Sequence, residues 1–586
     1  MKKLFMMVLS IIYITVLSLF LVGCVNDDNT LNSDDQILNI YNTYVAYASE
    51  NGETPLSYEQ WIESIKGEKG DKGDAGIDGV SPTIEISDDG YWVINGEKTE
   101  ILAKGEKGEQ GEQGEEGARG EDGRDSSGFF SQYVDVKDFG AQGNGVNDDT
   151  AAIRAARDEA HLKGKILYFS EGTYLLSGSI QLYSNMHLIG NNATLIKKAA
   201  ITQPITADVS AGDTVISVED ASKYTVGEDC YVGLTGTSNY GDTSAKITAI
   251  DTINNTITIA SYNRHFKNGV ARDVKVSSGG VFSSTFSMLC TFRGDDPGSD
   301  IIIEGITLDG NRQSNEPYSY QLSTIHIDPA GYNIRIKDCN VKRANADAIS
   351  VQSNGNVIVD GCIIESAKQN GIHVGFTVDS VSITNNQVYN CYNGFYDCYS
   401  VESLSIVGNT FNNCEYGCNG FDEESNGTVI SGNNFIGCKY GVKTGAVAGM
   451  TINGNSFTGI HIGIYSYRSG MATITGNTFN SLANAIYIKS GTGVVFNSNV
   501  IRNCTTPILV DENNNQNATK TTLCTFSNNM IYCTNKGKNA SIVVKYGDEI
   551  IIKDNILYGN NAKIEFNDKE NSTVVIEGNI ITNLNK

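Results

Sequence analysis

One apolar position recurs along the second half of the chain. From residue 301 on, an isoleucine, valine or phenylalanine anchors each short apolar run, and after a longer first interval the anchors repeat every 22 to 24 residues. The anchors are Ile303, Ile336, Val359, Ile383, Ile406, Ile430, Ile452, Ile474 and Phe496. No unit contains an amphipathic helical pattern, which disfavours leucine-rich and other helical repeats. The pattern predicts an all-β parallel β-helix of about 12 coils, with each strand pairing one coil away at about 4.8 Å.

A polar column follows the anchors at a fixed distance. Three residues after the anchors stand Cys339, Cys362, Asn386, Asn409, Asn433, Asn455, Asn477 and Asn499, and the series continues at Asn529, Asn555 and Asn579. Asparagine tolerates the left-handed backbone of turns, and stacked asparagines can hydrogen-bond along the column. We interpret the column as structural and assign it no catalytic role.

Cysteines recur at positions predicted to face the interior, among them Cys391, Cys414, Cys438 and Cys504. A free cysteine behaves there as a small apolar side chain. We therefore expect few or no disulfides, although 13 cysteines in a secreted chain could suggest them.

The entrance to the repeats carries a distinctive motif. The stretch from Val134 to Ile153 contains Asp138-Phe139-Gly140 and Asn147-Asp148-Asp149-Thr150, and Gly172-Thr173-Tyr174 and Leu188-Ile189-Gly190-Asn191 follow. It resembles the opening motif of the pectate lyase superfamily, with Asn144 at a position where that family usually has Asp. The resemblance covers residues 129–586 and implies a right-handed parallel β-helix. The superfamily includes lyases, hydrolases, epimerases and non-catalytic binders, so the fold does not give the activity.

Two segments depart from the coil pattern. Thr150 to Leu162 is predicted to form a short helix, with Asp148 and Asp149 near its N-terminus, that caps the open end of the solenoid. Residues 201–275 interrupt the pattern with short strands and turns, which predicts a small β insertion.

The start of the chain looks like a targeting segment. Lys2 and Lys3 precede an apolar run that ends in Leu21-Val22-Gly23-Cys24. This resembles the lipobox of bacterial lipoproteins and implies lipidation of Cys24 and cleavage directly before it, within the predicted signal segment 1–24. The protein would then be held by lipid on the extracellular side of a bacterial membrane. A transmembrane helix is the alternative.

A stalk follows the targeting segment. Residues 25–65 predict a linker and a short helical segment. Within 66–128, glycine recurs at every third position over 67–79 and again over 105–123, which is the requirement of a collagen triple helix and predicts a homotrimer. Residues 80–104 between these tracts predict a small hairpin module. A flexible charged linker is the alternative to a trimeric stalk.

Composition limits the partners. The chain has 586 residues and 40% hydrophobic residues, enough for a core. Its formal net charge of −25 argues against nucleic acid as a partner.

Candidate chemistry lies on one strand of each coil. In Gly371-Ile372-His373, period-two alternation places Ile372 inside and His373 outside. The same outward slot holds His326, Ser350, His373, Tyr396, Asn419, Lys443, Tyr465 and Tyr487, and the slot two residues on holds Asp328, Gln352, Gly375, Cys398, Phe421, Gly445, Tyr467 and Lys489. Aromatic rings stack on sugars, and polar groups bind hydroxyls and carboxylates. We predict a glycan-binding stripe, the alternative being an ordinary polar solvent face. Its predicted substrate-binding residues are His326, Asp328, Tyr465, Tyr467 and Tyr487.

Two catalytic arrangements are open. His373 and Tyr396 on neighbouring coils could remove the proton beside a uronic carboxylate and protonate the leaving oxygen, with Lys443 or His326 neutralising that carboxylate, as in a lyase. Asp397 and Asp422 could instead serve inverting hydrolysis, or bind Ca²⁺ together with Glu423 and Glu424. These acidic residues could also form only a solvated loop, without a catalytic or metal-binding role.

The full motif sets of polygalacturonases and mannuronan epimerases are absent, so the activity class is not inherited from the resemblance. The sequence predicts a cell-surface lipoprotein that acts on an extracellular polysaccharide as a lyase or glycoside hydrolase. The alternative is a non-catalytic glycan-binding adhesin on the same fold.

Overall fold

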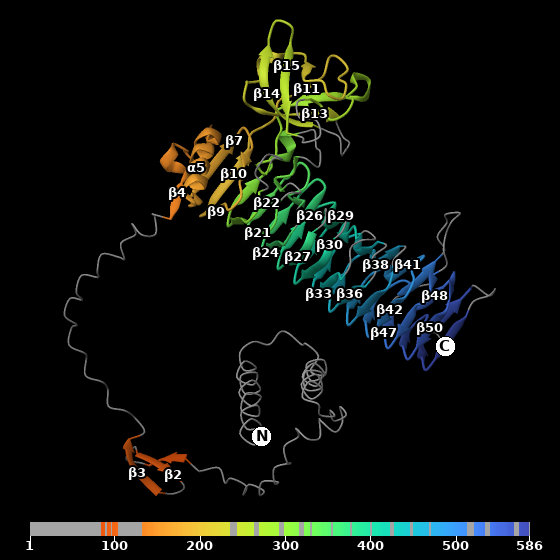
Figure 1. Cartoon of the computed structure of the whole chain (residues 1–586). Coiled ribbons are helices and arrows are strands. Elements are labelled where there is room, and N and C mark those ends of the chain that lie inside the picture. Colours follow the sequence, from red (N-terminus) through yellow and green to blue (C-terminus); the bar gives the residue numbers. More distant parts are fainter. Residues whose placement is uncertain are drawn as a thin grey trace, which may run out of the picture. The chain divides into compact units, whose positions relative to one another are not determined.

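The computed structural model describes two compact units, divided between Ala118 and Arg119 (Figure 1). The described residues are 84–87, 91–94, 97–102, 132–234, 243–262, 269–291, 298–315, 322–327, 331–352, 355–375, 378–398, 401–421, 427–445, 449–467, 470–511, 521–533, 540–567 and 573–584. The predicted signal with Cys24, the segment 25–65 and both glycine tracts lie outside these ranges. Within them, no helix is both long and apolar enough to cross a membrane.

The first unit contains a three-stranded antiparallel sheet in the segment predicted as a hairpin module. Strand β2 (Tyr91–Ile94) pairs with β1 (Ile84–Ile86) on one side and with β3 (Glu97–Leu102) on the other.

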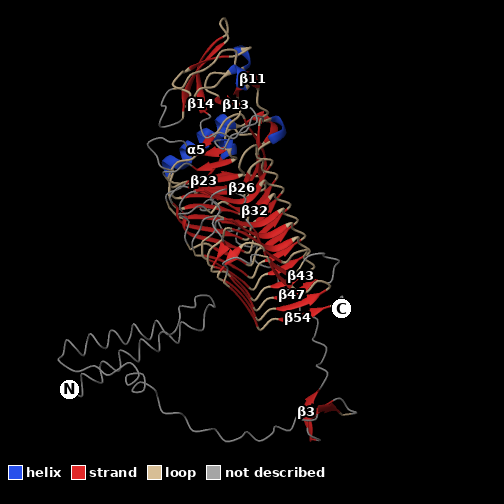
Figure 2. Cartoon of the chain, turned by 90° about the vertical axis from the view of Figure 1, so that its right-hand side faces the viewer, coloured by secondary structure: helices blue, strands red, loops and turns tan. Residues whose placement is uncertain are grey.

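The second unit is built on three long parallel sheets (Figure 2). Sheet 1 runs through 15 strands from β4 (Tyr133–Asp135) to β53 (Val574–Glu577). Sheet 2 runs through 15 strands from β5 (Asn144–Asp148) to β54 (Ile580–Asn583). Sheet 3 runs through 13 strands from β8 (Ile180–Gln181) to β52 (Ile564–Phe566). Most coils contribute one strand to each sheet, with sheet 3 two strands shorter than the others, and this is the predicted β-solenoid.

The predicted number of coils was too low. The coils predicted from the anchors begin at Ile303, whereas sheet 1 also contains β4, β6 (Ile166–Phe169) and β9 (His187–Gly190). The next strand of that sheet, β18 (Ile301–Glu304), pairs directly with β9. The sequence repeat is interrupted between β9 and β18. These strands are neighbours in space, but more than a hundred residues, including the insertion, separate them in the chain.

Helix α5 (Thr150–Lys163) occupies the segment predicted to be helical and ends at Gly164, whose φ is 59°. Its buried residues Ile153, Ala156 and Ala160 join the core of the solenoid. The carboxylate of Asp149 accepts hydrogen bonds from the backbone N–H of Gln142 (2.6 Å) and of Gly143 (3.2 Å). The entrance motif thus contains a turn whose backbone is hydrogen-bonded to the residue that precedes helix α5.

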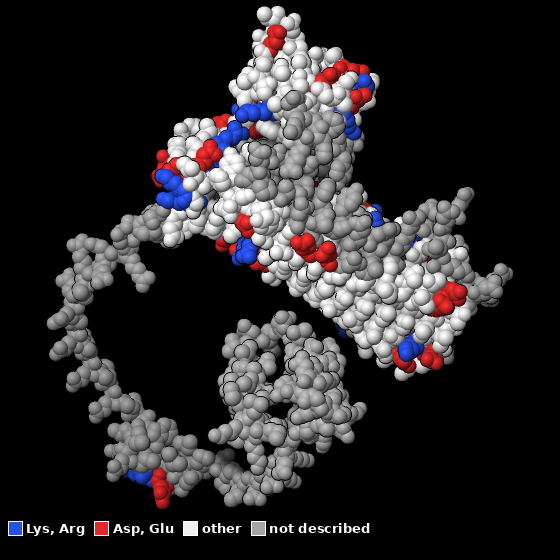
Figure 3. Space-filling model, viewed as in Figure 1, with Lys and Arg blue, Asp and Glu red and all other residues white. Residues whose placement is uncertain are grey.

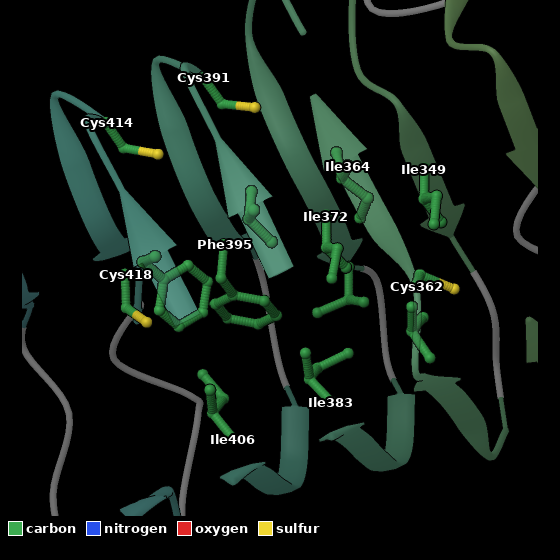
Figure 4. Close-up of a cluster of buried hydrophobic side chains, with 14 of the residues drawn as sticks. Ile349, Cys362, Ile364, Ile372, Ile383, Cys391, Phe395, Ile406, Cys414 and Cys418 are labelled. Carbon is green, nitrogen blue, oxygen red and sulfur yellow. The ribbon is translucent and has the colours of Figure 1, made fainter. Parts of the chain in front are cut away.

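The interior of the coils is filled by side chains that repeat from coil to coil. Figure 4 shows Ile349, Ile372, Phe395 and Cys418 in one such column. The rings of Phe411, Phe435, Phe457 and Phe479 form another, with successive centroids 5.2, 4.8 and 4.7 Å apart. The twelve cysteines in the described ranges are free, and eleven of them are buried.

The asparagine column is a hydrogen-bonded ladder inside the solenoid. The Nδ2 of Asn455 donates to the backbone oxygen of Ile430 (2.8 Å) and to Oδ1 of Asn477 (3.0 Å). Its Oδ1 accepts from the backbone N–H (2.9 Å) and Nδ2 (3.0 Å) of Asn433. The same pattern recurs at Asn386, Asn409, Asn477, Asn499, Asn529 and Asn555. The ladder satisfies backbone groups at turns that would otherwise be buried without partners.

The insertion is a six-stranded antiparallel sheet with a core of its own. Its strands, in spatial order, are β11 (Thr202–Pro204), β16 (Gly280–Ser283), β13 (Asp229–Leu234), β14 (Thr243–Asp251), β15 (Thr256–Ser261) and β12 (Val215–Ser217). Because β16 belongs to this sheet, the insertion extends beyond the predicted end at 275. Asp229 ties it to the first coils, since its Oδ2 accepts from Arg154 Nη2 (3.0 Å) and from the backbone N–H of Ser179 (2.7 Å).

We predict that Asn455→Ala lowers the free energy of unfolding by about 2–4 kcal/mol, because buried hydrogen-bonding groups lose their partner. Chemical denaturation monitored by circular dichroism measures the change. Asn434→Ala is the matched control, because Asn434 is exposed one coil away. Equal effects of the two substitutions would contradict a structural role for the ladder.

Candidate functional site

The predicted outward slot forms a continuous row on sheet 3. Strand pairing places His326, Ser350, His373, Tyr396 and Asn419 side by side in successive coils. The row continues through Lys443, Tyr465 and Tyr487. Its strands are β20 (Ile325–Ile327), β23 (Ile349–Gln352), β26 (Asn370–Gly375), β29 (Asn393–Cys398), β32 (Tyr416–Asn419), β35 (Tyr440–Thr444), β38 (Ile462–Tyr467) and β41 (Asn484–Lys489). Asp328 and Asp422 lie outside the described residues.

His373 occupies its predicted slot but is not exposed, which corrects the expectation of a solvent-facing imidazole. Its side chain is 4% exposed, and both ring nitrogens have partners. Nδ1 lies 2.8 Å from Oδ2 of Asp347, and Nε2 lies 3.0 Å from Sγ of Cys398. The alternation rule gives the side of the strand correctly, but it does not reveal what covers that side.

The charge of His373 is set by two opposing effects. Burial lowers the pKa of His373, whereas the charge of Asp347 and the hydrogen bonds to Asp347 and Cys398 raise it, and the net result is a pKa of about 10. His373 is therefore an imidazolium at neutral pH, held between a carboxylate and a sulfur.

Asp347 is held in turn by a second polar ladder. Its Oδ1 accepts hydrogen bonds from the backbone N–H (3.1 Å) and Nδ2 (2.8 Å) of Asn370. Asn393 donates to Oδ1 of Asn370 (2.7 Å), and Asn419 donates to Oδ1 of Asn393 (3.0 Å). Sequence reasoning missed Asp347, although Asp347, Asn370 and Asn393 recur at 23-residue spacing and could have been recognised.

The two remaining catalytic candidates of this region differ in exposure. Tyr396 is half-buried, and its ring packs edge-on against His373 with centroids 5.2 Å apart. Asp397 is fully buried and lies in register with Val374, at the inward phase that the sequence indicated. Asp397 is therefore not placed to protonate a bound glycan, which weighs against the hydrolytic arrangement.

The coil after β29 departs from the simple alternation. Phe421 was expected in an outward slot, but it is fully buried in the core with a φ of 62°. It follows Gly420, where a Cβ would stand 1.9 Å from the backbone oxygen of Asp397. This close approach of two coils ends the strand early and turns the next side chain inward.

A ladder of tyrosines lines the outer side of sheet 3. Successive ring centroids are separated by 5.7 Å (Tyr392 to Tyr416), 4.8 Å (Tyr416 to Tyr440), 5.7 Å (Tyr440 to Tyr465) and 5.5 Å (Tyr465 to Tyr487). Tyr467 adjoins Tyr465 at 6.1 Å. The predicted Tyr465, Tyr467 and Tyr487 thus belong to a longer aromatic surface. Its first three members were missed, although they recur every 24 residues.

Lysines accompany these rings. Nζ of Lys443 lies 5.4 Å from the ring centroid of Tyr416, and the amines of Lys439 and Lys489 lie 5.3 Å from the rings of Tyr440 and Tyr487. Desolvation raises the pKa of Tyr416 to about 12, so its hydroxyl stays neutral. In the view of Figure 3, uncharged side chains dominate the described surface of the solenoid. The chain as a whole is strongly acidic, but these lysines place positive charges next to the tyrosine rings.

The Ca²⁺ hypothesis has no support from the residues that can be described. Within the described ranges, no group of three or more His, Cys, Asp or Glu side chains is arranged to hold a metal ion. Asp422, Glu423 and Glu424 lie outside these ranges.

Comparison with known families agrees with the fold. Residues 133–396 match the model described as rhamnogalacturonase A/epimerase, pectate lyase-like, and residues 442–586 match the right handed beta helix region. Together with the β-solenoid, these matches support the pectate lyase superfamily.

Individual relatives match only in short stretches. The chain is 48% identical over 63 residues to mannuronan C5-epimerase AlgE1 of Azotobacter vinelandii, covering 9% of this chain and 4% of that protein. It is 44% identical over 66 residues to plasmin and fibronectin-binding protein A of Streptococcus pneumoniae, covering 11% and 9%. The chain thus spans at most a tenth of the length of these relatives. Among solved structures, the A-module of mannuronan C-5 epimerase AlgE4 of Azotobacter vinelandii aligns with 76% of this chain and 100% of its own, at 14% identity and a TM-score of 0.44.

The state of His373 can be tested directly. Because its folded pKa lies above the ordinary value of 6.5, the pair with Asp347 stabilises the protein fully below about pH 6.5 and loses this contribution as the pH rises through about 10. NMR of labelled imidazoles should show the His373 resonance, identified by its absence in His373→Gln, still protonated at pH 8. Asp347→Asn should lower that pKa. An imidazole that titrates near pH 6.5 in the unmodified protein would contradict the assignment.

Proposed function

We propose that this chain is an enzyme that acts on an extracellular acidic polysaccharide bound along the outer side of sheet 3. The observation that carries the proposal is the tyrosine ladder with its lysines on sheet 3, the sheet that also holds Tyr396 and His373. Stacked phenol rings offer apolar area to sugar faces, and lysine amines suit uronic carboxylates. The family models and the epimerase relatives, although short in extent, fit a substrate of this class.

The chemistry that fits the exposed groups is elimination, as in a polysaccharide lyase. Tyr396 is half-buried and, as its phenolate, is the group that would remove the proton beside a carboxylate; the phenol so formed would give that proton to the leaving oxygen and restore the phenolate. The imidazolium of His373 in contact with its ring would stabilise this phenolate. Lys443, which lies two coils from Tyr396 in the same row and has its amine over Tyr416, would neutralise the carboxylate of the substrate.

Hydrolysis is less well supported by the described residues. It needs two carboxyl groups on either side of the glycosidic bond. Asp397 is fully buried, and Asp347 is fully buried against His373.

The same proposal includes the location of the protein. We infer from the lipobox-like segment that Cys24 is lipidated and that the protein is held on the extracellular side of a bacterial membrane. The glycine tracts of residues 66–128 would then form a trimeric stalk that carries three solenoids away from the surface.

A non-catalytic glycan-binding adhesin is the second candidate. The specific observation in its favour is that the tyrosine ladder extends over five coils, far beyond the neighbourhood of Tyr396. Such a surface binds a chain whether or not a bond is broken.

The activity test follows reducing ends and the ultraviolet absorbance of unsaturated products with a panel of acidic and neutral polysaccharides. We expect both signals to rise together on an acidic substrate, and Tyr396→Phe to lower kcat about 100-fold or more because the transferable proton is lost. Tyr558→Phe is the control, since Tyr558 stacks on Tyr532 in sheet 2. Reducing ends without unsaturated products would indicate hydrolysis and contradict elimination. No product from any substrate would favour the adhesin.

The binding surface is tested separately. Tyr416→Ala and Tyr465→Ala should each weaken retention of the protein on a column of the same glycan by about three- to tenfold, as expected for loss of one stacking ring. Tyr558→Ala provides the comparison outside the ladder. Unchanged retention of both ladder variants would remove this surface from the proposed function.

A further inference from the structure

Three side chains from successive coils form a hydrogen-bonded line, of which the proposed elimination uses only the charge of His373. Asp347 precedes β23, His373 lies in β26 and Cys398 ends β29, and Figure 1 places β26 and β29 next to each other. The carboxylate is 2.8 Å from Nδ1, and the sulfur is 3.0 Å from Nε2 of the same imidazole. This is the order of orienting acid, base and nucleophile that acyl-transfer enzymes require.

The sulfur faces the outer side of the sheet. Gln352, Gly375 and Cys398 share one outward slot in three successive coils. A Cβ at Gly375 would stand 2.5 Å from Sγ of Cys398 and 3.2 Å from Oε1 of Gln352. A side chain at Gly375 would therefore collide with this sulfur, so glycine at this position allows Cys398 to lie beside His373.

A carboxamide lies beside the imidazole of His373. Nε2 of Gln352 is 3.4 Å from Nε2 of His373, the ring nitrogen that contacts the sulfur of Cys398. A neutral amide donor next to a nucleophile is suited to stabilising an oxyanion. The side chain is 8% exposed, which keeps it in a fixed, poorly hydrated position.

Other cysteines of the solenoid have different surroundings. Cys391 and Cys524 donate to backbone oxygens two residues earlier in the chain, each at 3.3 Å. Burial raises the pKa of Cys524 to about 11, so this thiol stays protonated. Cys398 instead faces an imidazole that carries a proton at neutral pH, which is the partner a thiolate needs.

We propose that Cys398 is a catalytic nucleophile that removes small acyl groups, such as acetyl, from sugar hydroxyls, with His373 as the proton carrier and Asp347 as the residue that positions it. The sugar as the alcohol component rests on the proposed function, whereas the thiol chemistry rests only on the geometry of these three residues.

The reaction balances with water as the co-reactant. The thiolate of Cys398 attacks the ester carbonyl carbon, a carbon–sulfur bond forms, and the carbon–oxygen bond to the sugar breaks. The departing sugar oxygen takes the proton from Nε2 of His373. Water then attacks the thioester while giving a proton to Nε2, the carbon–sulfur bond breaks, and the free carboxylic acid leaves the thiolate–imidazolium pair restored.

The test uses the full chain and p-nitrophenyl acetate as the probe. We expect a burst of p-nitrophenolate and a peptide containing Cys398 that gains the mass of one acetyl group. Cys398→Ala should abolish both signals. Cys533→Ser should leave them unchanged, because Cys533 is a half-exposed cysteine of sheet 2 outside this line. Acetylation of Cys533 as fast as that of Cys398, or no acetylation of Cys398, would overturn the proposal.

The role of Asp347 needs a measurement that loss of structure would not mimic. Asp347→Asn should slow acetylation of Cys398 by about 100-fold or more. It should also make the rate rise with pH like that of an ordinary thiol, whereas the unmodified protein should hold its rate toward acidic pH. Circular dichroism of both variants checks that the solenoid remains folded, and an unchanged pH profile in a folded Asp347→Asn protein would overturn the assignment of Asp347.

The two activities can be told apart on one substrate. Acetate release and unsaturated products are measured in parallel on an O-acetylated acidic polysaccharide. Acetate release that depends on Cys398, without unsaturated products, supports this inference and removes elimination. Unsaturated products with no acyl group on Cys398 would support elimination and overturn this inference.

Discussion

Parallel hydrogen bonding between coils is the constraint on which the rest of the solenoid depends. Every strand of the three long sheets pairs with a strand one coil away, so residues at one phase of the repeat are brought within about 5 Å of each other. An isolated coil could not bury its apolar side chains, and stacking creates the continuous core. The same rule forces any polar residue at an inward phase to find its partner in the next coil. The asparagine ladder from Asn386 to Asn579 meets this demand with side chains that both donate and accept.

The candidate site follows from the same stacking on the outer side of sheet 3. Residues that are about 23 positions apart in sequence, such as His373 and Tyr396, become neighbours. A second ladder, from Asn419 through Asn393 and Asn370 to Asp347, holds the carboxylate that sets the charge of His373. Structural support and chemical function therefore share one column, and the polar groups of the site are fixed by elements that are rigid over several coils.

The outer face also reconciles an acidic chain with an acidic ligand. A net charge of −25 repels polyanions at long range, but solution salt screens such fields beyond about 10 Å. At contact distance the ligand would meet the tyrosine rings and the amines of Lys439, Lys443 and Lys489. The same fold occurs in enzymes and in binding proteins, so the solenoid alone does not indicate the function. The tyrosine rings and lysine amines on its outer side do.

The sequence alone determined the repeat, the parallel β-helix, the asparagine ladder and the side of the strand on which His373 and Tyr396 lie. All of these follow from period-two alternation and a repeat of 22 to 24 residues, which are local properties of the chain. The first three coils were missed because the insertion separates β9 from β18 in sequence but not in space. Only the tertiary structure decided that His373 is buried, that Asp347 and Cys398 bracket its imidazole, and that Gly420 turns Phe421 inward. Burial and hydrogen-bond partners depend on which side chains the neighbouring coils bring across the sheet, and no pattern within one coil contains that information.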